Sequence, residues 1–145
     1  MESVSVFEPA FRGIVTSSVV PATGLKRWAA PIRVAIVDVS SRKDTINNGR
    51  VVLINPDITK WGGFAVGREG CMSVPDYTGN VIRAEKITLE CLDEMGQRRT
   101  YEMEGFKARA AQHEIDHLDG MLFLDRLVSR SGDLFRRKAY KKKEE

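Results

Sequence analysis

The sequence predicts an α+β fold in which mostly antiparallel strands surround one central helix. Three observations support this class. A β-branched run begins at Ile32, apolar and polar residues alternate between residues 81 and 103, and the apolar spacing becomes helical from Gly105 to Leu118. At 145 residues the chain is long enough to bury one core but not two independent ones. We therefore expect a single domain over residues 1–145.

The first half of this fold is expected to be strands. Residues 32–39 are rich in Val and Ile and predict a strand, and a polar loop follows over residues 40–48. A second strand is expected over Arg50–Ile54, ending at Asn55-Pro56 because proline cannot donate a ladder hydrogen bond. Residues 58–61 predict a further short strand.

The second half predicts a hairpin and then the helix. Residues 86–91 alternate between polar and apolar side chains, and residues 93–96 (D-E-M-G) supply a turn. An alanine-rich segment over residues 105–118 has helical spacing, and Gly120 is a natural C-terminal stop. A weak apolar stripe predicts one more helix over residues 126–142.

The composition is that of a globular protein, with 42% hydrophobic and 30% charged residues. No apolar run is long enough to span a bilayer, and the start of the sequence lacks the features of a signal peptide, so we expect a cytoplasmic protein with no membrane partner. The two cysteines stand in very different settings, which argues against a disulfide framework. In a reducing compartment their thiolates remain available to a metal.

The net charge of +3 is unevenly distributed. From Arg126 onward there are eight Lys or Arg residues against three acidic ones, a local balance of about +5. Residues 128–145 therefore form a basic tail or helix where an anionic partner would dock. The alternative is a solvated, frayed terminus.

The sequence has only two histidines, and both belong to the H-E-x-x-H pattern of residues 113–117. On a helix, His113 and His117 lie on one face, where two imidazoles can bind one metal ion beside Glu114. The alternative is a pair of helix-surface histidines. The position of both histidines in this pattern favours the metal site.

A catalytic metal site usually has three protein ligands and an open position. The third ligand here is a carboxylate downstream or a thiolate upstream. Cys91 lies in the apolar face of a strand, as a buried structural thiol does. Cys71 follows Gly70, precedes Ser73 by two residues and lies outside any alternating pattern, so the backbone is free to aim its thiol. Cys71 is therefore the best candidate.

Residues 69–73 (E-G-C-M-S) and 112–120 (Q-H-E-I-D-H-L-D-G) resemble the E-G-C-L-S and Q-H-E-x-D-H-L-x-G motifs of peptide deformylases. The resemblance extends over residues 32–127, including the run at 83–86. It implies that Cys71, His113 and His117 hold one divalent ion, typically Fe(2+). A site of this kind also accepts Zn(2+), Ni(2+) or Co(2+). The implied reaction removes the formyl group from the initiator methionine of newly made proteins.

The chemistry of these residues fits that reaction. A bound metal lowers the pKa of a water ligand and so provides a hydroxide that attacks the formyl carbonyl. Glu114 would take the proton of the water and pass it to the departing amine. The resemblance implies that the backbone N–H of Met72 holds the oxyanion, and the missing side chain of Gly70 would let an extended peptide lie alongside.

Two further carboxylates lie within the same two motifs. Glu69 is expected to be structural and to pair with Arg83. Asp116 either orients a neighbour or faces solvent from the helix.

The N-terminal residues 1–31 diverge from the family. A third motif, G-x-G-L-A-A-x-Q, usually precedes the strand that begins here at Ile32, but residues 23–31 read T-G-L-K-R-W-A-A-P and no Gln occurs before Asn48. The loss of one oxyanion donor costs on the order of 10²-fold in rate. A frameshift or a wrong start upstream of Ile32 is one hypothesis, which the encoding DNA tests.

Two functional interpretations follow. The first is an active, monomeric deformylase that acts on formyl-methionyl nascent peptides and docks on the ribosome through its basic tail. The second is a deformylase-like metal-binding protein with little or no activity, because the Gln motif is absent.

Two other classes are weaker. A zinc peptidase shares H-E-x-x-H but needs a downstream third ligand, and the acidic residues available there have no familiar spacing: Asp119, Asp125, Asp133, Glu144 and Glu145. A nucleic-acid-binding module would need basic residues interleaved with aromatic ones, which the sequence lacks.

Overall fold

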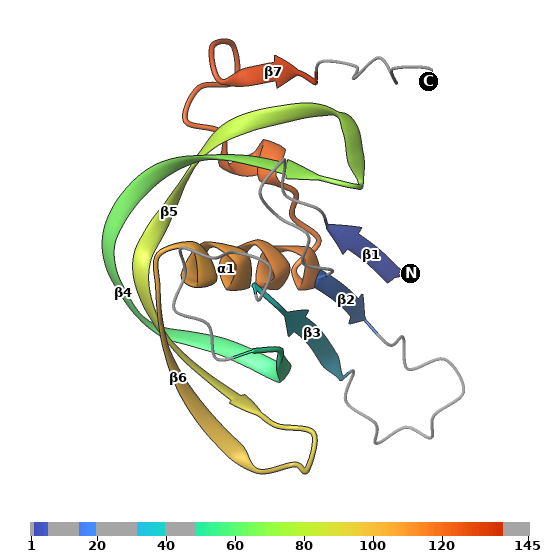
Figure 1. The fold of residues 1–145 in the computed structure, drawn as a ribbon, viewed down its shortest axis with the longest axis vertical. Coiled ribbons are helices and arrows are strands. Elements are labelled where there is room, and N and C mark those ends of the chain that lie inside the picture. Colours follow the sequence, from blue (N-terminus) through green and yellow to red (C-terminus); the bar gives the residue numbers. More distant parts are fainter. Residues whose placement is uncertain (1, 6–14, 20–31, 40–48, 138–145) are drawn as a thin grey trace, which may run out of the picture.

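The computed structural model describes residues 2–5, 15–19, 32–39 and 49–137 (Figure 1). Within these ranges, no helix has the length and apolar character needed to cross a membrane. The elements follow one another as β1 (Glu2–Ser5), β2 (Val15–Val19), β3 (Arg33–Val37), β4 (Val51–Cys71), β5 (Val74–Leu92), β6 (Arg98–Glu104), α1 (Phe106–Leu118), the 3₁₀ helix η1 (Phe123–Arg126) and β7 (Leu134–Arg136).

The strands form one antiparallel sheet in the order β1-β2-β3-β4-β5-β6, and β7 pairs with β5. The two long strands, β4 and β5, curve around α1 (Figure 1). Register shifts within their pairing accompany this curvature, since an irregularity in the ladder bends the strand and increases its twist. The predicted α+β class, with antiparallel strands around a central helix, is confirmed.

The first long strand departs from the prediction at Pro56. We expected the strand over residues 50–54 to end there, but β4 continues from Val51 to Cys71. The ladder instead shifts register between Ile54 and Asp57, next to a positive φ of 50° at Asn55. Proline is tolerated at such irregularities, so it interrupts the pairing without ending the strand.

The hairpin and the helix agree with their predictions. Asp93 accepts hydrogen bonds from the backbone N–H groups of Met95 and Gln97, at 2.8 and 2.9 Å, and this closes the turn between β5 and β6. Gly96 supplies the positive φ that the turn requires. Helix α1 ends at Leu118, and Gly120, with φ 75°, redirects the chain as expected.

The helix predicted over residues 126–142 is wrong for its described part. Residues 134–136 form β7 and pair with Tyr77, Thr78 and Gly79 of β5. An unpaired stretch of β5 offers a row of backbone donors and acceptors, and this outweighs the weak helical stripe. The predicted loop over residues 40–48, the divergent segment at 20–31 and the lysine cluster after Arg137 lie outside the described residues.

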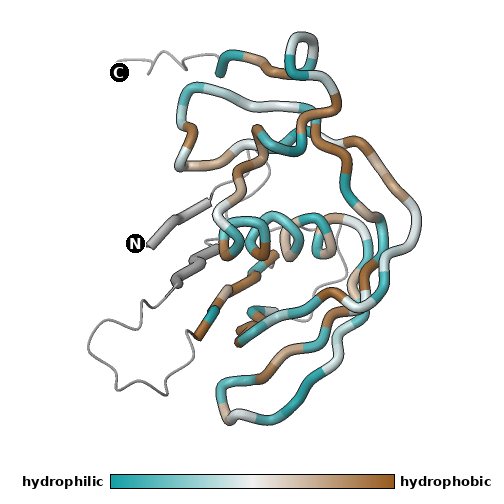
Figure 2. The backbone as a smooth tube through the Cα atoms, turned by 180° about the vertical axis from the view of Figure 1, so that it is seen from behind, coloured by the Kyte–Doolittle hydropathy of each residue, from teal (hydrophilic) through white to brown (hydrophobic). Residues whose placement is uncertain are grey.

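The core lies between α1 and the sheet. Alanines at positions 108, 110 and 111 are fully buried and let the helix approach the strands closely. Figure 2 shows apolar and polar stretches alternating along the long strands, as expected for strands with one covered face. Cys71, Val81 and Phe123 form a second, smaller cluster. The main cluster includes Ala35, Val37, Leu53, Ile87, Leu89, Met103 and Ile115.

Replacement of Leu89, which is fully buried in the main cluster, tests this account of the core. Leu89→Ala leaves a cavity between β5 and α1 and should lower the free energy of unfolding by about 2–5 kcal/mol. Urea denaturation measures the change. Ile82→Ala on the same strand is the control, because Ile82 is exposed and its loss should have little effect. Equal losses from the two variants would contradict this core.

Candidate metal centre

The structure brings the three predicted ligands together from two elements. Cys71 is the last residue of β4, and His113 and His117 lie one helical turn apart on α1. His117 Nε2 lies 3.3 Å from Cys71 Sγ and 3.0 Å from His113 Nε2. The ligand atoms of the three residues all lie within 4.8 Å of one another.

This donor set fits a tetrahedral divalent ion. Donors bound at 2.0–2.3 Å to such an ion lie roughly 3.3–3.7 Å apart, and the two distances from His117 Nε2, 3.3 Å to Cys71 Sγ and 3.0 Å to His113 Nε2, are close to this range. Cys71 and His113 are buried, whereas His117 is only partly covered. Two of the candidate ligands are therefore shielded from solvent, and the third lies on the side that solvent can reach. This arrangement suits an ion that keeps one coordination position for a water.

Glu69 holds the first histidine in place. Its Oε2 lies 3.0 Å from His113 Nδ1, so the other ring nitrogen, Nε2, is directed at the triad. Burial alone lowers the pKa of His113, but hydrogen bonds with Cys71 and Glu69 and the charge of Glu69 outweigh it and raise the pKa to about 9. In the metal-free protein His113 therefore carries a proton that a metal must displace.

Glu69 is itself held by two arginines. Arg83 donates to both of its carboxylate oxygens, at 2.9 and 3.0 Å, and Arg109 donates to one of them at 2.8 Å. Burial alone raises the pKa of Glu69, but the hydrogen bond with His113 and the contacts with Arg83 hold it well below its usual range. Glu69 is 1% exposed and remains ionised, and its predicted contact with Arg83 is confirmed.

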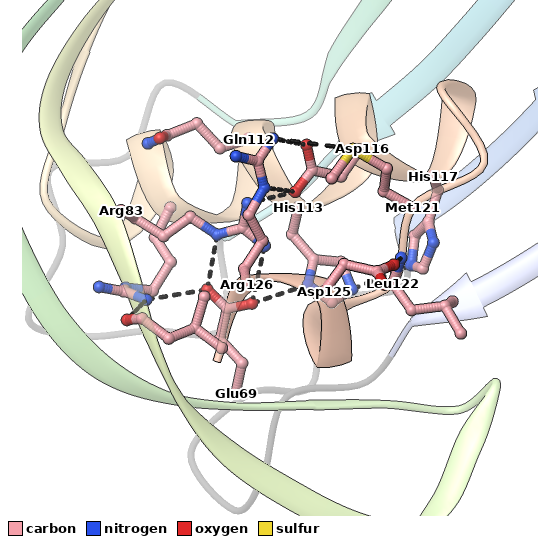
Figure 3. Close-up of polar contacts among 12 residues, drawn as sticks. Glu69, Arg83, Gln112, His113, Asp116, His117, Met121, Leu122, Asp125 and Arg126 are labelled. Atoms are coloured by element: carbon pink, nitrogen blue, oxygen red, sulfur yellow. Dashed lines mark hydrogen bonds and ion pairs between the residues drawn. The ribbon is translucent and has the colours of Figure 1, made fainter. Parts of the chain in front are cut away.

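Asp116 orients neighbouring side chains, which is one of the two roles predicted for it. It is buried on α1 and accepts hydrogen bonds from Arg83 of β5 and from Arg126 of η1 (Figure 3). Arg83 therefore bridges the two carboxylates Glu69 and Asp116. This network connects the sheet, helix α1 and η1 through charge-assisted hydrogen bonds.

Glu114 lies beside the triad without belonging to it. The residue is fully buried, and its Oε1 is 3.9 Å from His113 Nε2. A carboxylate at this position is close enough to the ligand atoms to exchange a proton with a group bound there.

Met72 and Gly70 flank the cysteine. Met72 lies in the turn between β4 and β5 and is 51% exposed. Gly70 is buried, and a Cβ added to it would lie 2.5 Å from Arg137 Nη2 and 3.3 Å from Thr78 Cγ2. The side chains of Arg137 and Thr78 thus fill the space beside the Cα of Gly70. A peptide bound next to Gly70 would contact its backbone groups.

Three polar residues around the site were not predicted. Arg109 lies one turn before His113 on the same face of α1, a spacing that could have revealed it. Gln112 pairs with both backbone groups of Ala84 and ties α1 to β5. Arg126 has no local signal, because its contact with Asp116 depends on the path of the chain after α1.

Three of the five acidic residues that a zinc peptidase would need are engaged elsewhere, and the other two, Glu144 and Glu145, lie outside the described residues. Asp119 pairs with Arg33, Asp125 accepts from the backbone of Leu122, and Asp133 accepts from Asn80. In the part of the chain that the structure describes, the triad of Cys71, His113 and His117 is the group arranged for a metal.

Glu69→Gln tests the buried network. The amide removes the buried counter-charge of Arg109 and one of the two that Arg83 contacts, so the free energy of unfolding should fall by about 3–5 kcal/mol. Glu104→Gln is the matched control, because Glu104 is 69% exposed in its ion pair with Lys86 and should contribute at most about 1 kcal/mol. Urea denaturation compares the two variants. A Glu69 variant no less stable than the control would rule out this role.

Comparison with known proteins agrees with the site. The family model described as polypeptide deformylase matches residues 28–132. A peptide deformylase of Thermodesulfovibrio yellowstonii is 42% identical over 111 residues, which cover 77% of this chain and 66% of that protein. Peptide deformylase 2 of Xanthomonas campestris is 36% identical over 148 residues, covering 97% of this chain and 85% of that protein.

A solved structure supports the same relationship. The class I type b peptide deformylase of Acinetobacter baumannii, with Met-Ala-Ser bound, matches with a TM-score of 0.59 and 39% identity over 65% of this chain and 62% of that one. The chain spans 66%, 60% and 53% of the length of three curated relatives, so it matches a part of each. The sequence and structure matches together show that the chain belongs to the polypeptide deformylase family.

Proposed function

We propose that the chain removes the N-formyl group from the initiator methionine of newly made proteins. The observation that carries this proposal is the convergence of Cys71, His113 and His117 beside the buried carboxylate of Glu114. A thiolate with two imidazoles suits Fe(2+), and also Zn(2+), Ni(2+) or Co(2+). We propose Fe(2+) as the resident ion, on the family resemblance.

A divalent ion held by Cys71, His113 and His117 would lower the pKa of a coordinated water enough to make it a nucleophile near neutral pH. The residues around it prepare the site. Glu69 orients the imidazole of His113 with Nε2 toward the triad. The contacts with His113 and Arg83 keep Glu69 ionised, and Arg109 donates a further hydrogen bond to it. Preorganised contacts of this kind need no rearrangement during the reaction.

Glu114 moves the proton. It would accept a proton from the attacking water and deliver it to the nitrogen of the departing methionine as the C–N bond of the formamide breaks. Its burial supports this role, because a carboxylate away from bulk water exchanges protons with the reacting groups rather than with solvent.

The turn after Cys71 would receive the substrate. The backbone N–H of Met72 is proposed to stabilise the oxyanion that develops on the formyl oxygen, and the backbone of Gly70 to contact the extended peptide. The related protein of Acinetobacter baumannii has been solved with Met-Ala-Ser, a peptide that begins with methionine. We propose formyl-methionyl nascent chains as the substrate and a monomeric single domain as the active form.

The absence of the Gln motif supports a second candidate function, that of a metal-binding protein with little or no deformylase activity. No Gln occurs before Asn48, so the oxyanion donor that the family resemblance places there is missing from this sequence. A protein with the triad but without that donor could bind a metal and react slowly or not at all.

The hydrolysis of formyl-Met-Ala-Ser under anaerobic conditions tests the proposal. The full chain, reconstituted with Fe(2+), should release formate, and Glu114→Gln should lower kcat by about 10²–10⁴-fold without loss of metal. Glu85→Gln, an exposed residue of β5, is the control and should retain full activity.

The outcomes separate the two functions. Formate release that disappears in the Glu114 variant supports the deformylase. A protein that binds one equivalent of metal through Cys71 but releases no formate would support the metal-binding alternative.

A further inference from the structure

The C-terminal strap, residues 128–137, lies against the hairpin that carries the metal ligand Cys71. Its strand β7 pairs with Tyr77, Thr78 and Gly79 of β5, shortly after the turn that follows Cys71. Figure 1 shows β7 beside the closed end of the β4–β5 hairpin, away from β6. The strap thus covers the part of the sheet on which the metal centre depends.

Hydrogen bonds anchor both ends of the strap. Asn80 donates its backbone N–H to the carbonyl of Asp133 at 2.9 Å and its side-chain amide to the carboxylate of Asp133 at 2.7 Å. Val128 donates to the carbonyl of Asn80 at 3.1 Å, and Arg137 donates its backbone N–H to Asp76 at 2.8 Å. The strap is therefore fixed before and after β7.

A cation–π contact adds to this attachment. The guanidinium carbon of Arg68 lies 3.6 Å from the ring centroid of Phe135, and Arg68 also donates to the Thr78 hydroxyl at 3.2 Å. The cationic guanidinium is attracted to the negative face of the aromatic ring. The two contacts of Arg68 orient β7 over the strand pair of β4 and β5.

Two arginines hold β4 from its two faces. The side chain of Glu69 faces α1, so the following residue, Gly70, faces the opposite side of the strand. A Cβ at Gly67 would lie 2.8 Å from the guanidinium carbon of Arg109, which comes from α1. A Cβ at Gly70 would lie 2.5 Å from the guanidinium of Arg137, which comes from the strap.

We propose that Arg137 is a positioning residue for the metal centre. Gly70 directly precedes Cys71 and has the widest backbone freedom of any residue, so its conformation must be set by its surroundings. The guanidinium of Arg137, with Nε and Nη2 buried, covers the open face of Gly70. By limiting the movement of Gly70, it keeps the Cys71 thiol and the Met72 N–H directed at the site.

This inference rests on the proposed function, because it assumes that Cys71 binds a metal. Small displacements of a ligand matter for such a site, and loss of a residue that supports a ligand typically costs 10–100-fold in metal affinity. Arg136 provides a matched control. It is the last residue of β7, directly precedes Arg137, carries the same charge and has an exposed side chain.

A cobalt titration of the metal-free full chain tests the role of Arg137. The absorption band of a thiolate bound to Co(2+) reports Cys71 directly, and a purely structural effect on the strap would not change it. Arg137→Gln should weaken Co(2+) binding by about tenfold or more and reduce this band. Arg136→Gln should bind as the unmodified chain does. Urea midpoints establish that each variant is folded.

If Arg137→Gln does not fold, Arg137→Lys replaces it, because lysine keeps the charge but lacks the planar head group that covers Gly70. It should bind Co(2+) about threefold or more weakly, and unchanged affinity would overturn the inference. Equal affinity and an equal band in Arg137→Gln and Arg136→Gln would also overturn it. If the unmodified chain showed no thiolate band, the proposed metal site itself would be refuted. Failure of the metal site can therefore be distinguished from failure of the role proposed for Arg137.

Discussion

The buried carboxylate of Glu69 joins the three parts of the chain that form the candidate metal centre. It lies near the end of β4, accepts hydrogen bonds from Arg83 on β5 and Arg109 on α1, and contacts His113. A carboxylate removed from water needs such partners, because a buried charge is costly unless it is paired and hydrogen-bonded. The contacts that satisfy Glu69 therefore also set the distance between the sheet and the helix, and with it the position of Cys71 relative to the histidines.

The shape of the sheet makes these contacts possible. The strands β4 and β5 curve around α1, so the end of β4 reaches the same face of the helix that presents the histidines (Figure 1). Small residues allow the close approach: the buried alanines of α1 pack on the strands, and Gly67 leaves room for the guanidinium of Arg109. The arrangement of Cys71, His113 and His117 thus depends on the curvature of the sheet and on small side chains as well as on the three residues themselves.

Local rules predicted much of this arrangement. The two histidines of H-E-x-x-H share a helix face by spacing alone. The position of Cys71 outside an alternating run distinguished it from Cys91, although the structure buries both thiols. The rest depended on partners distant in the sequence. β4 passes Pro56 because β5 holds it on either side of the irregularity, and residues 134–136 form a strand because β5 offers them a free edge. No pattern in the sequence connects Arg137 to Gly70.

The binding of one metal ion by a thiolate and two imidazoles is the central claim of this account. X-ray absorption at the zinc edge of the chain loaded with one equivalent of Zn(2+) tests it most directly, because sulfur and nitrogen neighbours differ in distance, about 2.3 against 2.0–2.1 Å. The account predicts one sulfur and two imidazole nitrogens, with the sulfur lost in Cys71→Ser. A spectrum with only nitrogen and oxygen neighbours in the unmodified chain would contradict it.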